Sequence, residues 1–316
     1  MQWDTHHCVV TQTQDAAGLT VSASYDWRFL TLVQLTDIND NVHFMTLDAL
    51  GRPVTQRFWG IENGVMTGYS SPEQMPFSPP PGVDAALALS APLPVAQYLV
   101  YASESWMPVF SQDTFNTLTK EEQATLRNSR IITEDWRICA LAHRHWVQDQ
   151  KTDTPLVNLL TRSIGLSPHN LMLTTDRYDS DSEQQIRQQV AFSDGSGRLL
   201  QAAVRHEAGE AWQRNQDGSL ITKTEDTKTR WAVTGRTEYD NKGQPVRTYQ
   251  PYFLNDWRYV SDDSARKEAY ADTHVYDPVG REIRVITAKG WLRQSQYYSW
   301  FTVSEDENDT AADTLV

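Results

Sequence analysis

A few clusters of polar residues in this sequence are of types that could bind a metal ion or take part in catalysis. His143 and His145, in the run HRHW, stand two residues apart and would share one face of a strand. Two imidazoles are too few for a metal site, and no cysteine or carboxylate follows at a helpful spacing. His6, His7 and Cys8 are three donors in a row, but strand alternation would turn His7 away from the other two. Both places therefore favour packed or surface side chains over a metal centre.

Carboxylates gather in two runs, SDDSARKE from Ser261 and SEDENDTAAD from Ser304. Such groups could bind calcium or act as general acids and bases, yet neither run has the glycine-centred spacing of an EF-hand loop. The run DGSGR from Asp194 has the glycines of a phosphate loop but lacks its Gly-Lys-Ser/Thr ending. No Gly-x-Ser-x-Gly or His-Glu-x-x-His motif occurs. The sequence predicts no catalytic residues, no metal site and no cofactor.

A different pattern, Asp-x-x-Gly followed by Arg or Gln, occurs four times. An Asp at the first position of a type I turn accepts backbone amide hydrogen bonds, and a glycine takes the left-handed conformation that closes a bulged hairpin. Each copy therefore predicts a β-hairpin, with irregular spacing between the copies. The copies are LDALGRPVTQ, SDGSGRLLQA, YDNKGQPVRT and YDPVGREIRV, and their turn residues are Asp48, Gly51, Arg52, Asp194, Gly197, Arg198, Asp240, Gly243, Asp277, Pro278, Gly280 and Arg281.

The arginine after each turn glycine, replaced once by Gln244, could bind a ligand. A structural role is favoured, because an arginine stem covers apolar surface while its head can hydrogen-bond turn carbonyls. The many Trp and Tyr residues could stack on sugars, but they are spread along the whole chain at strand positions. That distribution favours sheet packing.

The elements that carry these turns divide the sequence into four predicted segments. Hairpins occupy residues 1–75 and 176–303, a mixed insertion with loops and short helices occupies 76–175, and an acidic tail occupies 304–316. The stretch from Ser70 to Asp84 is rich in Pro and Ser and predicts a loop. Thr119 and Glu122 form a capping box that predicts a helix in LTKEEQATLRNSR, and further helices are expected at Thr154–Leu166 and Ser261–Asp272.

Composition restricts the class of protein. The 316 residues include 11 Trp, 13 Tyr and 9 Phe, enough for an ordered core, and the net charge of −13 argues against binding nucleic acid or an anionic membrane. No apolar run reaches membrane-spanning length. Two cysteines, Cys8 and Cys139, predict free and mostly buried thiols and a reducing compartment. We expect no signal peptide, and strand-like alternation almost from the first residue suggests a piece of a longer protein.

The Tyr-Asp-x-x-Gly-Arg hairpins resemble the RHS/YD repeats of polymorphic toxins and cell-surface proteins. Longer stretches are similar to the C-terminal region of the B component of bacterial Tc insecticidal toxin complexes, over essentially the whole chain. The stretches that carry this resemblance include VVTQTQDAAGLT, RIITEDWRICAL, YQPYFLNDWRYVSDDSAR and ITAKGWLRQSQYYSWFTVSEDEND.

The resemblance implies a mainly β fold, with hairpins forming part of a curled, shell-like sheet and a few short inserted helices. In that family the B and C components form a hollow shell that holds the cytotoxic segment of the C component unfolded. The implied partner is the C component; contact with the A component is implied only through N-terminal regions that this chain lacks. We expect folding in the bacterial cytoplasm before release or secretion as part of the complex, and, because catalytic constellations are absent from the sequence, no catalysis by this segment. Rival hypotheses are a carbohydrate-binding or adhesion module and, further away, a glycosidase with paired carboxylates.

Overall fold

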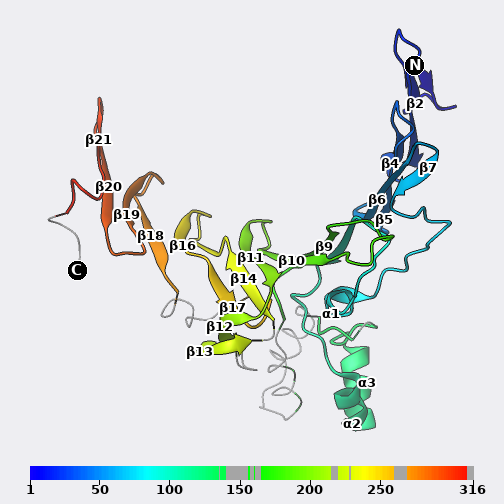
Figure 1. Ribbon diagram of the computed structural model, residues 1–316. Helices are drawn as coiled ribbons and strands as arrows, with labels where there is room; N and C mark the ends of the chain where they lie inside the picture. The colour runs from blue at the N-terminus through cyan, green and yellow to red at the C-terminus, as the bar shows by residue number, and fades with distance from the viewer. Residues whose placement is uncertain are drawn as a thin grey trace. The chain divides into compact units, whose positions relative to one another are not determined.

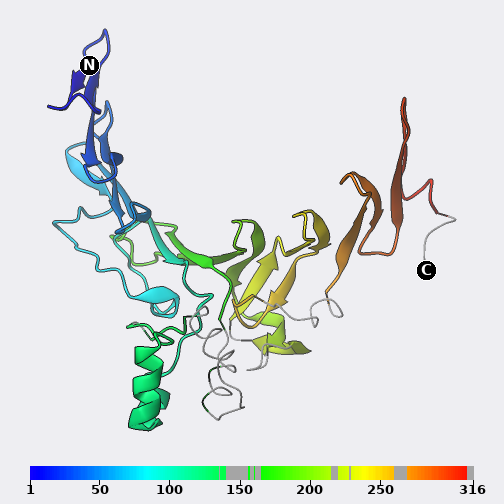
Figure 2. The ribbon, with the colours of Figure 1, turned by 180° about the vertical axis from the view of Figure 1, so that it is seen from behind.

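The computed structural model describes residues 1–134, 136–139, 156, 160, 165–214, 220–227, 229–259 and 269–311. The fold is mainly β, as the sequence predicted (Figures 1 and 2). The chain forms two compact units, Met1–Tyr101 with Asn170–Val190 and Ala102–His169 with Ala191–Val316. Each unit is described by itself. The division into four segments stays a prediction.

The first six strands of the first unit form an antiparallel run in chain order, in which each strand pairs with the next. β7 pairs with one part of β6 and β8 with another, so that Trp59 faces Gly68 and Thr55 faces Tyr98. The strands are β1 (Gln2–Trp3), β2 (Val10–Gln14), β3 (Thr20–Asp26), β4 (Thr31–Thr36), β5 (Val42–Leu47), β6 (Pro53–Glu62), β7 (Val65–Gly68), β8 (Gln97–Ala102), β9 (His169–Thr175) and the first part of β10 (Ile186–Ser193).

The second unit contains two groups of hydrogen-bonded strands. The first group runs in the order β11 (Leu199–His206), β14 (Arg230–Thr234), β17 (Tyr252–Leu254), β12 (Gly209–Arg214) and β13 (Leu220–Thr227). The second group is antiparallel throughout, in the order β15 (Thr237–Tyr239), β16 (Pro245–Tyr249), β18 (Ala271–Tyr276), β19 (Glu282–Ile286), β20 (Leu292–Tyr297) and β21 (Thr302–Glu305).

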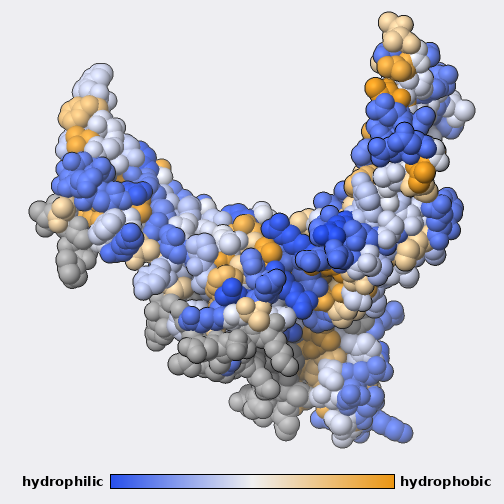
Figure 3. All heavy atoms as spheres, in the orientation of Figure 1, coloured by the Kyte–Doolittle hydropathy of each residue, from blue (hydrophilic) through white to orange (hydrophobic). Residues whose placement is uncertain are grey.

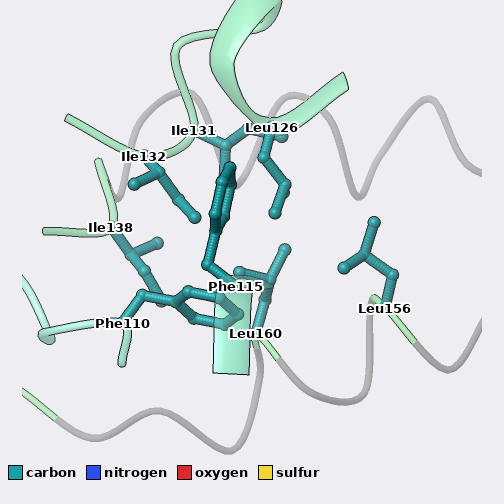
Figure 4. Close-up of a cluster of buried hydrophobic side chains, with 8 residues drawn as sticks. All are labelled: Phe110, Phe115, Leu126, Ile131, Ile132, Ile138, Leu156 and Leu160. Atoms are coloured by element: carbon teal, nitrogen blue, oxygen red, sulfur yellow. The ribbon is translucent and has the colours of Figure 1, made fainter. Parts of the chain in front are cut away.

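The second unit also holds two short helices, α2 (Gln112–Thr117) and α3 (Lys120–Asn128), over a compact apolar cluster. The predicted capping box of α3 is confirmed, because the Thr119 hydroxyl accepts from the Glu122 amide and the Glu122 carboxylate accepts from the Thr119 amide. The clustered side chains converge in Figure 4; they are Phe110, Phe115, Leu126, Ile131, Ile132, Ile138, Leu156 and Leu160, all at most 6% exposed.

Two predictions in the inserted regions need correction. The helix α1 (Gly82–Leu87) begins inside the stretch predicted as a loop. Pro81 is tolerated at its N-cap because proline has no backbone N–H that would need a partner there. The helix also buries Val83 and Ala86. The helix predicted at Ser261–Asp272 cannot extend to its expected end, since Ala271 and Asp272 belong to β18. Residues 261–268 of that stretch lie outside the described residues, as does Thr154–Leu166 apart from Leu156, Leu160, Gly165 and Leu166.

Two strand boundaries also differ from the sequence pattern. The alternating run before Asp240 divides into β14 and β15 at Gly235, whose φ of 63° interrupts the extended backbone. The acidic segment begins within β21, and its Thr310 is buried, with a hydroxyl that donates to the carbonyl oxygens of Leu292 and Asp306. This segment is therefore attached to β20 through Thr310.

Hydrophobic surface is visible over the N-terminal strands and again over the C-terminal strands (Figure 3). Exposed aromatic residues occur in both places, among them Trp3, Trp27, Trp291, Trp300 and Phe301. Not all aromatic residues are therefore used in sheet packing. Among the described residues, no helix has both the length and the hydropathy to cross a membrane.

Candidate functional site: the Asp–Gly turns

The structure places all four Asp-x-x-Gly copies in hairpin turns of one geometry. In each turn, the backbone amide of the Asp donates a hydrogen bond to the carbonyl of the residue four positions later, at 2.9–3.0 Å. The backbone amide of the Gly donates to the carbonyl of the same Asp, at 2.9–3.1 Å. The glycines have φ values of 79–90°, in the left-handed region that an L side chain rarely adopts. Each Asp Oδ1 also accepts the amides two and four residues on, at 2.8–3.0 Å. We call these the Asp–Gly turns.

The arginine of each turn binds the aspartate of the same turn. Its Nε donates to the Asp Oδ2 at 2.6–2.7 Å, in the pairs Arg52–Asp48, Arg198–Asp194 and Arg281–Asp277. The sequence suggested turn carbonyls as acceptors for these heads, and the structure places the Nε on the turn carboxylate, which the planar guanidinium matches with an added charge–charge attraction. Gln244 occupies the same position without an ion pair.

A tyrosine from a later strand completes each turn. Its hydroxyl donates to the carbonyl five residues after the turn's Asp, and in three cases the turn arginine lies over its ring at 4.2–4.6 Å. We call this contact the tyrosine tie. The ties are Tyr101 to Pro53 at 2.9 Å, Tyr239 to Leu199 at 3.1 Å, Tyr276 to Pro245 at 2.9 Å and Tyr297 to Glu282 at 3.0 Å.

In the second unit the turns beginning at Asp194, Asp240 and Asp277 also touch one another. A Cβ at Gly243 would lie 2.5 Å from Nη1 of Arg198, so the arginine of one turn occupies the space beside the glycine of the next. Gln244 Nε2 then donates to the Gly280 carbonyl at 2.7 Å, and Lys242 Nζ donates to the Pro278 carbonyl at 3.0 Å. We call these three turns and their contacts the turn ladder.

Three of the four turn carboxylates, those of Asp48, Asp194 and Asp277, have lowered pKa values and are held as anions. The amide hydrogen bond from Arg198 lowers the pKa of Asp194, and that from Arg281 lowers the pKa of Asp277; the paired guanidinium adds to both shifts. Burial would raise the pKa of Asp48, but the amide and guanidinium of Arg52 bring its pKa below the usual value. These groups are therefore acceptors at neutral pH and not proton donors.

The same backbone geometry occurs at places that the sequence pattern missed. Turns closed by the same two hydrogen bonds begin at Asp15, Asp37, Thr133 and Thr287. Gly18 and Gly290 take the left-handed position in two of them, while Asp40 and Trp136 take it in the others. A search for Asp-x-x-Gly without the following Arg would have found Asp15. The other three lack either the Asp or the Gly, so the residue pattern alone does not reveal them.

The other candidate residues do not assemble into a chemical centre. His6 to Cys8 form a loop and not the expected strand, because the Asp4 carboxylate accepts the amides of His6, Cys8 and Val9 at 2.6–2.9 Å. Cys8 is exposed, contrary to the prediction of buried thiols. His143, His145 and the run from Ser261 to Glu268 lie outside the described residues. Within the described part of the chain, no group of three or more His, Cys, Asp or Glu side chains is arranged to hold a metal ion.

The described carboxyl groups that have a resolved pKa shift differ from the general acid of a glycosidase. A general acid needs a raised pKa, whereas each described carboxyl with a resolved shift has its pKa lowered by hydrogen bonds from amides or side chains. The arrangement of these groups stabilises turns, and its chemistry is hydrogen bonding and charge pairing.

Comparison with known proteins identifies relatives among solved structures. No family model matches the sequence, and no curated protein matches it. The TcdB2–TccC3–Cdc42 crystal structure matches at 71% identity with a TM-score of 0.94, over 99% of this chain. TcdB2–TccC3 without its hypervariable C-terminal region matches at 70% and 0.93, over 100% of this chain. The Tc holotoxin pore of Photorhabdus luminescens matches at 71% and 0.93, over 98%.

These matches cover a small part of the relatives. The chain spans 14–15% of the length of the matched chains, so it corresponds to one region within them. Identity of 70–71% along nearly every residue, together with TM-scores of 0.93–0.94, fixes both fold and ancestry. The chain therefore belongs to the Tc toxin family, as a region of its B component.

Proposed function

We propose that this chain is a wall segment of the shell that a Tc toxin B component forms with its C component, and that it does no catalysis. The observation that carries the proposal is the match along the whole chain to TcdB2–TccC3 assemblies. The enclosed cargo is the variable C-terminal part of the C component, and the A component receives the assembly through other regions of the B component. The whole protein folds in the bacterial cytoplasm and is then released as part of the complex.

The Asp–Gly turns support a wall role physically. A wall must keep neighbouring hairpins in register without a thick apolar core behind every strand. The tyrosine ties meet this need, because each joins a later strand to the turn of an earlier hairpin through a backbone carbonyl. The turn ladder adds direct contacts between successive turns, so that the edge formed by the turns is itself hydrogen-bonded.

A chimera tests the proposal. The matching region of TcdB2 is replaced by this chain, and the chimera is produced together with TccC3. We expect a stable complex in which the C-terminal region of TccC3 resists a protease as well as it does with unaltered TcdB2. The comparison sample is the same chimera carrying Asp194→Ala, Asp240→Ala and Asp277→Ala, which remove the carboxylates of the turn ladder and should expose that region to digestion.

Two results would overturn the proposal. One is a soluble, folded chimera that does not associate with TccC3. The other is a complex in which the C-terminal region of TccC3 is cleaved as fast as in free TccC3. Catalysis is tested separately, by incubating the purified chain with a panel of chromogenic glycosides, for which we expect no turnover above buffer.

A further inference from the structure

The first unit contains a cleft of about 960 Å³ that the Asp–Gly turns do not use. It lies where β6, β8 and the end of β9 meet the loop from Asp176 to Ser182. Phe58 contributes to its floor, and Tyr178 and Tyr69 stand beside that ring. We propose that this cleft binds a neutral sugar, with one pyranose ring lying on the Phe58 side chain.

The floor of the cleft is a rigid aromatic group. The rings of Phe58, Tyr69 and Tyr178 meet edge to face, with centroids 5.3–5.7 Å apart and interplanar angles of 76–87°. Tyr69 is buried, and its hydroxyl is bonded to Thr175 at 2.6 Å and to the Arg177 carbonyl at 3.1 Å. Phe58 is 39% exposed, so part of its surface remains open to a ligand.

The wall of the cleft is held in place before any ligand arrives. The buried Gln184 side chain bonds the amide and carbonyl of Leu93 at 2.6 and 3.0 Å and the Arg177 carbonyl at 2.8 Å. Asp179 Oδ1 accepts the Ser70 amide at 3.0 Å. A ligand therefore does not have to order this loop, which lowers the entropic cost of binding.

The charges around the cleft select against anions. Arg177 lies within 3.7 Å of Asp176, 3.2 Å of Asp181 and 2.8 Å of Glu183, so three carboxylates surround one guanidinium. A phosphate or carboxylate ligand would meet net negative charge. The same paired groups retain free lone pairs that can accept hydrogen bonds from sugar hydroxyls, and the exposed Ser180 and Ser182 add hydroxyls at the rim.

The residues that line the cleft disfavour a wholly apolar ligand. It is open, and its lining combines a few aromatic rings with many hydroxyl and charged groups. A pyranose fits this mixture, since its ring C–H groups form an apolar face while its hydroxyls project around the edge. The open site favours weak binding.

The test uses the purified 316-residue chain with maltotriose, cellotriose and chitotriose as probes, followed by saturation-transfer NMR and calorimetry. We expect at least one of the three to bind. Phe58→Leu keeps an apolar floor but removes the ring, and should weaken binding at least tenfold. Ser180→Ala with Ser182→Ala changes only exposed hydroxyls and should weaken it several-fold without affecting folding. Trp300→Ala, at an exposed aromatic residue outside the cleft, should bind like the unaltered chain.

The proposal is overturned if none of the three sugars binds. It is overturned equally if Phe58→Leu and the double serine variant both bind as the parent does, or if Trp300→Ala loses as much affinity as Phe58→Leu. Tighter binding of a sulfated heparin disaccharide would show that charge and not the aromatic floor governs the cleft. None of these outcomes affects the wall proposal, which depends on association with TccC3.

Discussion

The helical cluster around Phe115 and the sheet from β15 to β21 are stabilised in opposite ways. The cluster buries eight apolar side chains to 6% exposure or less. In the six strands of the sheet, β15, β16 and β18 to β21, the buried residues are Tyr249 at 6% and Val285 at 9%. A folded sheet with so little buried apolar surface needs other sources of stability.

The difference shows what the recurring geometry of the Asp–Gly turns does for the sheet. In the helical cluster, removal of apolar area from water supplies the main driving force. In the sheet, cross-strand hydrogen bonds, ion-paired turns and tyrosine ties hold the strands together. The cluster should therefore respond to lost volume, and the sheet to lost hydrogen bonds and altered turns.

The largest expected effect is in the helical cluster. Phe115→Ala should destabilise the region that contains α2 and α3 by about 3–5 kcal/mol, because it removes a buried ring that packs edge-on against Trp136. Hydrogen exchange measured by mass spectrometry across residues 110–138 would report the loss. Val285→Ala in β19 serves as the comparison. If Val285→Ala reduced the protection of β19 as much as Phe115→Ala reduces that of residues 110–138, the contrast between the two regions would be lost.

The next effect concerns the turn ladder. Gly243→Ala and Gly197→Ala both force an L residue to a φ near +80°, at a cost of about 1–2 kcal/mol each. A methyl group at Gly197 meets nothing within 4 Å, whereas one at Gly243 would displace Arg198. Gly243→Ala should therefore lower the melting temperature more. Equal shifts for the two variants would mean that the contact between successive turns contributes nothing.

A smaller effect is expected from a single tyrosine tie. Tyr276→Phe deletes the hydroxyl that donates to the Pro245 carbonyl and should cost about 0.5–1.5 kcal/mol. Tyr298→Phe is the matched control, because that hydroxyl bonds the side chain of Gln296 at the surface. Chemical denaturation of both variants measures the difference. The tie would be dispensable if Tyr276→Phe proved as stable as Tyr298→Phe.

The smallest effect is that of pH on the turns. Asp194 and Asp277 have lower pKa values in the folded chain than the usual 3.8, so their contribution is fully present above the unfolded pKa. It is lost as the pH falls through the folded pKa, when protonation removes the acceptors of the turn. Thermal unfolding from pH 6 to pH 2 should show a shallower decline for Asp277→Asn than for the parent. If the melting temperatures of the parent and of Asp277→Asn fell in parallel with pH, the Asp277 carboxylate would make no pH-dependent contribution to stability.

Features set by neighbouring residues could be predicted from the sequence. The Asp48, Asp194, Asp240 and Asp277 turns and the Thr119 cap depend on residues at most four apart, whose backbone preferences are strong. The ion pair between Arg198 and Asp194 was within the same reach, but an arginine head has several possible acceptors, and residue type alone does not choose among them. The loop after Asp4 was missed because the alternating pattern placed residues 6–8 in a strand, whereas the amides of His6, Cys8 and Val9 converge on the Asp4 carboxylate.

Features set by distant residues could not be predicted. Nothing in the sequence near Tyr101 indicates that its hydroxyl reaches Pro53, because that pairing depends on how β6 and β8 lie together. The cleft beside Phe58 likewise needs Tyr69 and Tyr178, which come from segments far apart in the chain. Helix α1 forms because Val83 and Ala86 find a buried position, which a local pattern does not report.

The tyrosine ties have an evolutionary consequence. They close chain segments of 48, 40, 31 and 15 residues with the same hydrogen bond, so the contact does not depend on the length of what lies between. Closing a longer loop costs little more entropy than closing a short one. A gene of this kind can therefore acquire or lose whole hairpins and helices between ties while the spacing of its anchoring residues drifts. This explains why the turns recur at irregular intervals within one continuous architecture.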